Sequence, residues 1–307
     1  MGAPLWAWFA AVGVLAALLG VDLAANRSAG EPTIRRALVA SGGWIAASVA
    51  FGVVLGLAQG SAVAQQFFAG YLLEKALSVD NVFVFAVLFG ALAVPAEYQH
   101  RVLYYGVVGA LALRAGFIAA GAALLDHFGW VLYLFGAVLV VAGVRMVRPQ
   151  RPVDPERNLA MRAVRRVLPV TGGFCGDRFV VRKDGRRWAT PLLVAVVAIE
   201  ATDIVFATDS IPAVFGVTQD TFVVFTSNAF AVLGLRSLYF VFARAADRFE
   251  YLRYGLAVLL VFIGVKLLVS PVAHLSVVVS LAVIVGVLGM AVLASLWRGR
   301  RTGGAPG

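Results

Sequence analysis

Five acidic residues lie inside stretches of this sequence that are otherwise strongly apolar. They fall in two segments, EKALSVDNVFVF (74–85) and AIEATDIVFATDSIPAVF (198–215). A charged side chain at the centre of a bilayer costs roughly 2.5–3.5 kcal/mol, so acids at that depth need partners. The acids are Glu74, Asp80, Glu200, Asp203 and Asp209, and the charge-balancing residues available to them are Lys75, Arg114 and Arg236. The excess of negative charge leaves room for a bound cation.

The oxygen donors in these segments narrow the kind of cation. Carboxylates, amide carbonyls and hydroxyls are hard ligands that suit Mg²⁺, Ca²⁺ or Mn²⁺. The candidate ligands are Glu74, Asp80, Asn81, Glu200, Asp203, Thr208, Asp209 and Ser210, with Ser78, Asn228 and Asp22 as further candidates. The single cysteine, Cys175, lies in a basic loop, and the three histidines lie at or near the ends of apolar stretches. Tight selection for zinc or copper is therefore not expected.

Several of these residues also have a purely structural explanation. Arg114 and Arg236 could be fixed counter-ions, and the acids could pair with basic groups in a structural network. Asn228 has the character of an interhelical hydrogen-bond residue. Asp22 falls near the end of its apolar stretch, where it can reach water. These alternatives stay open at the level of sequence.

The spacing of the acids sets a geometric requirement. Glu74 and Asp80 are six residues apart, as are Asp203 and Asp209. Residues six apart in a continuous helix point about 120° away from each other. Local unwinding would let both acids of a pair reach one cavity. Pro212 cannot donate a hydrogen bond to the carbonyl of Thr208, which favours such a break in the second segment.

The elements that position these residues are predicted to be membrane-spanning helices. The chain of 307 residues is 61% hydrophobic and 14% charged, with a mean hydropathy of +0.90. In lipid the backbone must satisfy its own hydrogen bonds, so apolar stretches of about 20 residues are helical. The sequence predicts an all-α polytopic membrane protein, a single membrane domain over residues 1–307. Its nine expected spans are 5–24, 37–58, 64–92, 102–124, 129–147, 189–213, 221–243, 254–270 and 275–297.

The net charge of +10 is concentrated in one loop. Between Arg148 and Arg187 there are eleven Arg or Lys against four Asp or Glu. Alternate connections carry the basic residues, which predicts an outside N-terminus, an inside C-terminus, a basic cytoplasmic loop over 148–188 and a cytoplasmic tail over 298–307. This bias explains the charge without a nucleic-acid partner. Contact with anionic membrane lipid is a further expectation.

Two parts of the chain have the same order of features. Acids six apart are followed by an arginine in GALALRAGF (Arg114) and FAVLGLRSLYF (Arg236), and then by Arg145 and Lys266. The copies are expected at about 64–147 and 189–270. With three spans in each copy, they run in opposite directions across the membrane. Inverted repeats are typical of secondary transporters, whose sites lie at the repeat interface near mid-membrane.

The sequence resembles the TerC/Alx integral membrane family of bacteria, within the LysE-type transporter superfamily. The resemblance rests on GYLLEKALSVDNVFVF, YQHRVLYYGVVGALALRAGFI, AIEATDIVFATDSIPAVF, TSNAFAVLGLRSLYF and RYGLAVLLVFIGVKLL, and extends from about Asp22 to Leu268. It implies Mn²⁺ efflux across the cytoplasmic (inner) membrane and an association with tellurite resistance. It also implies a LysE-like fold of inverted three-helix repeats. The family's acidic motif positions fall on Glu74, Asp80, Asn81, Glu200, Asp203, Asp209 and Ser210.

The leading hypothesis is therefore a Mn²⁺ exporter with no permanently bound cofactor. Glu74, Asp80, Asp203 and Asp209 would bind the ion, with Glu200 as a further ligand or a proton carrier. Proton exchange is the expected driving force, and the oligomeric state is left open. An enzyme is not expected, because the chain has no HExxH, GxGD or GxSG motif. Two alternatives remain: transport of Ca²⁺ or another cation, and a membrane partner that supplies metal to exported proteins in contact with the secretion machinery.

Overall fold

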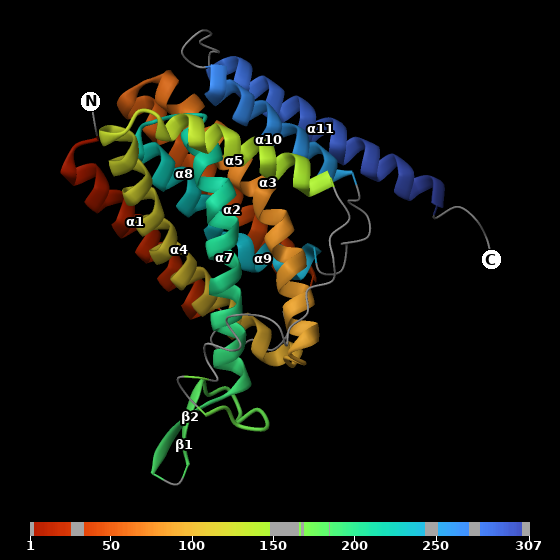
Figure 1. Cartoon of the computed structure of the whole chain (residues 1–307). Helices are drawn as coiled ribbons and strands as arrows, with labels where there is room; N and C mark the ends of the chain where they lie inside the picture. Colours follow the sequence, from red (N-terminus) through yellow and green to blue (C-terminus); the bar gives the residue numbers. More distant parts are fainter. Residues whose placement is uncertain are drawn as a thin grey trace.

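Helices make up almost all of the computed structural model shown in Figure 1. It describes residues 3–25, 34–147, 166, 169–183, 185–242, 251–269 and 277–302. The helices in these ranges are α1 (Leu5–Ala25), α2 (Ile34–Gln59), α3 (Ser61–Ala91), α4 (Ala96–His127), α5 (Val131–Val147), α7 (Pro191–Phe215), α8 (Thr221–Leu233), α9 (Leu235–Phe242), α10 (Leu252–Val269) and α11 (Val277–Thr302). Six helical segments are long and apolar enough to cross a membrane. The chain is thus an all-α polytopic membrane protein, as predicted.

The helices follow the predicted spans, with differences at their ends. α3 and α4 have 31 and 32 residues, longer than the apolar stretches 64–92 and 102–124. At 1.5 Å per residue each is roughly 45 Å long, well beyond a hydrocarbon core of about 30 Å. α11 continues to Thr302, so the helix extends beyond the span predicted at 275–297 into the start of the expected tail. Most of the basic loop, including 148–165, lies outside the described residues.

The expected unwinding of the acidic segments is wrong. α3 runs without a break past Glu74 and Asp80, and α7 does so past Asp203 and Asp209. Pro212 lies inside the last turn of α7, where its ring costs one hydrogen bond but its fixed φ still suits a helix. The break falls instead at Gly234, which divides the seventh predicted span into α8 and α9.

The packing crosses between the two proposed copies. α3 packs on α8 and α4 packs on α7, while α5 lies along α10. At the α5–α10 contact, a Cβ added at Gly136 would lie 2.9 Å from the carbonyl oxygen of Gly264, and one added at Gly264 would lie 2.7 Å from that of Gly136. An inverted repeat would produce such a reciprocal contact, though the repeat itself stays a prediction. In Figure 1, α5, α10 and α11 run across the top of the molecule, and α4 and α7 descend from it.

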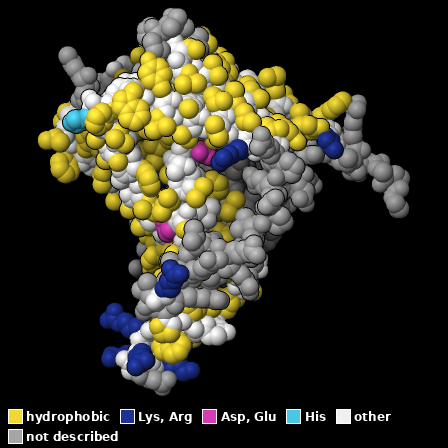
Figure 2. Space-filling view, in the orientation of Figure 1, with side chains coloured by type: hydrophobic (Ala, Val, Ile, Leu, Met, Phe, Trp, Pro, Cys, Tyr) yellow, Lys and Arg dark blue, Asp and Glu magenta, His cyan; other side chains and the backbone are white. Residues whose placement is uncertain are grey.

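A small β-hairpin projects below the helices in Figure 1. β1 (Val180–Lys183) pairs with β2 (Arg186–Ala189), and Gly185 in the turn has a φ of 73°. Sequence analysis missed this hairpin, although Asp-Gly between two short strands is its strongest short-range signal. Figure 2 shows basic side chains gathered at this end and hydrophobic side chains over the body above. The exposed basic residues are Arg178, Arg182, Lys183, Arg186 and Arg187.

The α5–α10 contact predicts a steric effect at Gly143. A Cβ at this position would lie 2.7 Å from the carbonyl oxygen of Ala257, so Gly143→Ala must push the two helices apart. We expect the free energy of unfolding to fall by about 1–3 kcal/mol, the usual cost of overpacking. Thermal unfolding in detergent, compared with wild type, measures this change.

Gly289→Ala is the matched control, because no atom lies within 4 Å of a Cβ added at this α11 position. Alanine has a higher helix propensity than glycine, so the melting temperature of the Gly289→Ala variant should not fall below that of wild type. Equal melting temperatures for the two variants would contradict close α5–α10 packing.

Candidate functional site: a buried charge cluster around Arg114

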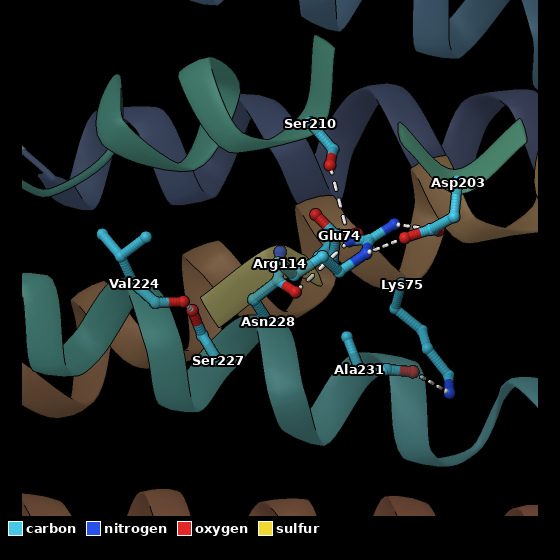
Figure 3. A network of polar contacts seen from close by, with 9 residues as sticks. All are labelled: Glu74, Lys75, Arg114, Asp203, Ser210, Val224, Ser227, Asn228 and Ala231. Carbon is cyan, nitrogen blue, oxygen red and sulfur yellow. Dashed lines mark hydrogen bonds and ion pairs between the residues drawn. The ribbon is translucent and has the colours of Figure 1, made fainter. Parts of the chain in front are cut away.

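The guanidinium of Arg114, from the middle of α4, is the centre of the buried polar cluster in Figure 3. Arg114 is 1% exposed. Its Nε donates to Oδ2 of Asp203 over 3.0 Å, and its Nη2 donates to Oδ1 of the same residue over 2.9 Å. This two-point contact uses the planar fork of the guanidinium, a geometry that an ammonium group cannot reproduce. It ties α4 to α7.

The third nitrogen of Arg114 connects the other two helices of the cluster. Nη1 forms a buried ion pair with Oε1 of Glu74 from α3. The same nitrogen donates longer hydrogen bonds to Oδ1 of Asn228 on α8 (3.3 Å) and to Oγ of Ser210 on α7 (3.5 Å). Figure 3 shows all four partners pointing at this guanidinium. Helices from both proposed copies therefore meet at one arginine.

The cluster has more polar capacity than Arg114 satisfies. Two carboxylates share one guanidinium, so the group carries an excess negative charge when both acids are ionised. Oε2 of Glu74, Oγ of Ser78 and Nδ2 of Asn228 are buried without a hydrogen-bond partner within the described part of the chain. A buried polar group left unsatisfied costs about 1–3 kcal/mol. The unsatisfied carboxylate and hydroxyl oxygens suit a small cation, whereas Nδ2 of Asn228 is a donor that would need an acceptor.

Glu200 lies beside the cluster, against α4. A Cβ added at Gly109 would lie 2.2 Å from its Oε1, so a larger residue here would displace this carboxylate from its observed position. Both carboxylate oxygens are buried and have no hydrogen-bond partner among the described residues. Gly109 was predicted as a close-packing glycine of its span but not as a residue of the site.

Among the described side chains, Lys75 forms no ion pair with the acids. Its Nζ donates to the carbonyl oxygen of Ala231 over 3.0 Å, in the last turn of α8. A Cβ at Gly234 would lie 2.6 Å from the same nitrogen. The lysine thus sits at the negative end of the α8 dipole, beside the break between α8 and α9. In Figure 3 it points away from Arg114 and toward Ala231.

Arg236 also has a partner other than the central acids. Its Nη2 lies 2.8 Å from Oδ1 of Asp22, and the two side chains are 9% and 11% exposed. This ion pair joins α1 to α9. Sequence analysis singled out both residues but did not pair them, because α1 stands outside both proposed copies.

The structure brings together only part of the predicted ligand set. Glu74, Asp203, Ser210 and Asn228 meet at Arg114, and Ser78 and Asn81 are buried. Thr208 is exposed and donates to the carbonyl oxygen of Val205, with partly exposed Asp209 beside it. The side chain of Asp80 lies outside the described part.

Asp209 lies apart because α7 stays helical, which turns it about 120° away from Asp203. Among the described side chains, no three His, Cys, Asp or Glu residues form a group that could hold a metal ion. An ion at Arg114 would therefore rely on two carboxylates and neutral oxygens. The ligand roles stay predictions.

Comparison with known proteins identifies the family. The model of the integral membrane protein TerC family matches residues 59–303, which is more than half of the chain. The chain belongs to the TerC family. The match contains α3, α4, α7 and α8, so the charge cluster falls within the family region.

Curated relatives of this TerC protein match it along nearly its whole length. A Myxococcus xanthus protein described as "Uncharacterized membrane protein STKORF319" is 46% identical over 98% of this chain and 94% of its own length. The Escherichia coli K12 "Putative membrane-bound redox modulator Alx" is 43% identical over 97% of this chain and 96% of its own. A Rickettsia bellii membrane protein is 35% identical over 95% and 97% of the two chains. No solved structure matches. Family and fold support a multi-pass membrane protein with a transporter-like role.

The cluster predicts that Arg114 and Asp203 are energetically coupled. Arg114→Gln leaves two buried carboxylates without a counter-charge, which should lower the free energy of unfolding by about 3–5 kcal/mol. Adding Asp203→Asn removes one uncompensated charge, so the double variant should lose less than the sum of the two single losses. Thermal unfolding in detergent measures all three variants.

Arg182→Gln provides the control, because Arg182 is an exposed residue of the hairpin. A surface substitution of this kind changes stability by about 0.5 kcal/mol or less. Strictly additive losses for Arg114→Gln and Asp203→Asn would show that the two side chains do not interact.

Proposed function

We propose that this TerC-family protein exports Mn²⁺ across the bacterial cytoplasmic membrane, with its N-terminus outside and its C-terminus inside. The observation that carries this proposal is the meeting of Glu74 and Asp203 at the buried guanidinium of Arg114. Acids inside a membrane bundle mark ion pathways by default, because their burial is expensive. Here they come from α3 and α7, the first helix of each proposed copy, where carriers built on inverted repeats bind their substrates.

In this mechanism Arg114 acts as a tethered counter-ion. With no metal bound, its guanidinium neutralises Asp203 and one oxygen of Glu74. An entering divalent cation competes with the guanidinium for those oxygens and for Oδ1 of Asn228, and the hydroxyl oxygen of Ser78 is a further ligand. When the ion leaves, Arg114 returns. The two carboxylates are therefore never left without a counter-charge inside the membrane, and the free energy of the empty carrier stays low.

The donor set supports a hard divalent ion, and the family resemblance favours Mn²⁺ among these. Carboxylate, amide and hydroxyl oxygens do not by themselves separate Mn²⁺ from Ca²⁺ or Mg²⁺. Transport of Ca²⁺ is therefore the alternative within the same mechanism. Exchange against protons is the proposed driving force, since carboxylates can trade a bound metal for protons. Glu200, with both carboxylate oxygens buried, is a candidate proton carrier or further ligand.

The description of the Escherichia coli relative as a membrane-bound redox modulator suggests a different chemistry for this chain. Cys175 is the single cysteine of the sequence, and it is exposed. One cysteine cannot form the intramolecular dithiol couple of a thiol oxidoreductase. The buried acids therefore support ion transport more directly than thiol chemistry.

A membrane partner that supplies metal to exported proteins is the alternative from another class. Such a protein would use the same acids but move little ion on its own, and it would copurify with the secretion machinery. Binding and flux must therefore be measured separately.

The proposal predicts selective Mn²⁺ flux that depends on the central acids. Inside-out vesicles containing wild type should accumulate Mn²⁺ in preference to Ca²⁺, Mg²⁺ and Zn²⁺. Glu74→Gln, Asp203→Asn and Asp80→Asn should each lower the Mn²⁺ rate at least about tenfold, a loss of roughly 1.4 kcal/mol or more in ion stabilisation. Uptake of radioactive or fluorescence-quenching Mn²⁺ measures the rate.

Asp126→Asn is the matched control, because Asp126 is an exposed acid near the end of α4 and should keep wild-type flux. Equal rates in Asp203→Asn and Asp126→Asn would eliminate the proposed site. Preferential Ca²⁺ flux would identify Ca²⁺, and not Mn²⁺, as the transported ion.

A second prediction concerns binding without transport. Mn²⁺ at a hundredfold excess over its Kd should raise the free energy of unfolding of the purified protein by about 2.7 kcal/mol. Glu74→Gln should remove this stabilisation. Mn²⁺-dependent stabilisation of a wild type that shows no flux would support the metal-supply alternative, and no stabilisation in any condition would contradict both readings.

A further inference from the structure

The short helix α9 stands between the charge cluster and the end of the molecule that carries the hairpin. Tyr239 of α9 donates to Oε1 of Gln99, near the start of α4, over 2.9 Å. Its ring packs edge-on against Phe89, near the end of α3, at 5.4 Å. The same part of α4 holds the hairpin, because Tyr105 packs against Phe179 just before β1. α9 therefore fills the space among the helix ends on the hairpin side of Arg114.

α9 is separated from α8 by a break that only one of the proposed copies has. Aligning GALALRAGF with FAVLGLRSLYF on their arginines places Ala112 opposite Gly234. α4 continues through Ala112, whereas the helix ends and restarts at Gly234. A glycine between two helices is a position where the chain can change direction at low steric cost. The break at Gly234, a candidate hinge, therefore has no counterpart in α4.

Two contacts connect this hinge to the charge cluster. Lys75 follows Glu74 directly in α3, and its Nζ binds the carbonyl oxygen of Ala231 and lies against Gly234. A shift of α3 at Glu74 would therefore move Lys75 and change its contacts at Ala231 and Gly234.

A third contact holds the start of α9 against α1. The Asp22–Arg236 pair at 2.8 Å joins α9 to α1, and both side chains are about nine-tenths buried. Breaking a buried ion pair leaves an uncompensated charge, so this pair holds α9 against α1.

We propose that α9 is a gate on the hairpin side of the site, hinged at Gly234 and held closed by the Asp22–Arg236 pair. In the closed position, which is the one observed, Arg236 is held by α1 and Tyr239 by α4. Release of Arg236 from Asp22 lets α9 swing at Gly234 and opens a path to Glu74 and Arg114. Asp22 and Arg236 act as positioning residues that set the gate and do not hold the ion. The gate rests on the proposed function, which supplies the reason for a path, but its opening can be measured without transport.

The experiment measures access to a reporter placed between the gate and Arg114. Ser78 lies one turn beyond Glu74 toward the hairpin side, is 1% exposed, and its hydroxyl has no hydrogen-bond partner among described residues. Ser78→Cys in a full-length Cys175→Ser background therefore adds one buried thiol without breaking a bond. A membrane-impermeant maleimide is applied to inside-out and to right-side-out vesicles, and the rate of labelling is measured.

We expect slow labelling in this reporter protein from both sides. Asp22→Asn and Arg236→Gln should each raise the rate at least about fivefold in inside-out vesicles alone, because they shift the population toward the open gate. The exchanged pair, Asp22→Arg with Arg236→Asp, should return the rate toward that of the reporter protein. Asp177→Asn is the control: it removes the ion pair between Asp177 and Arg101 at the same end, which does not involve α9, and should leave the rate unchanged.

Unchanged labelling in both Asp22→Asn and Arg236→Gln would overturn the gate, as would an equal rise from the two sides of the membrane. The first result would make the pair a fixed structural contact, and the second would indicate general loosening. Because labelling requires no metal and flux is measured separately in the wild-type protein, a one-sided rise in labelling together with no wild-type Mn²⁺ flux would keep the gate and reject the exporter. Normal wild-type Mn²⁺ flux with unchanged labelling would reject the gate and keep the exporter.

Discussion

The removal of Arg114 from water is the constraint on which the rest of the bundle depends. A guanidinium in the middle of a membrane protein is tolerated only when its charge and its donors are matched. Arg114 meets this requirement with two bonds to Asp203 and one to Glu74, so α3, α4 and α7 must converge on one point. Moving α7 by one residue would shift Asp203 by 1.5 Å and turn it by about 100°, losing both bonds. The arginine thus sets the register of the helices as well as the charge of the site.

Small residues make this convergence sterically feasible. Helices in a membrane associate through close packing, since burial from lipid adds little driving force. A Cβ at Gly70 would lie 2.7 Å from Oγ of Ser227, where α3 meets α8, and Gly109 gives way to the carboxylate of Glu200 where α4 meets α7. The helices that carry the polar cluster therefore meet at glycines whose missing side chains leave space for polar groups of the neighbouring helix. The same glycines that allow packing leave room for polar side chains.

The helices and the residues that meet at Arg114 could be named from the sequence, because both follow from local signals. Hydropathy placed the spans to within a few residues, and acids in apolar segments pointed to Glu74 and Asp203. Asp209 and Thr208 do not join the cluster at Arg114, because the expected unwinding is absent and α7 stays helical past both residues.

The Asp22–Arg236 pair joins residues 214 positions apart, which no periodicity or spacing reveals. The β-hairpin was missed for a different reason: its Asp-Gly signal was present, but the basic loop was treated as charge alone. Local patterns therefore predicted elements, and only the packed structure could assign partners to the charges.

The central arginine also bears on how tightly an ion could be held under the proposed function. A pocket of bare carboxylates would bind a divalent cation strongly and release it slowly, which suits a structural site. A carrier needs binding that is favourable enough for entry and weak enough for exit. Because Arg114 is attached to the same bundle, it competes for Asp203 and Glu74 at every instant, and each ion must displace contacts already made at about 3 Å. The cost of that displacement lowers the affinity and is returned when the ion leaves. A tethered counter-ion therefore makes the loaded and the empty states similar in energy, as repeated cycles of transport require.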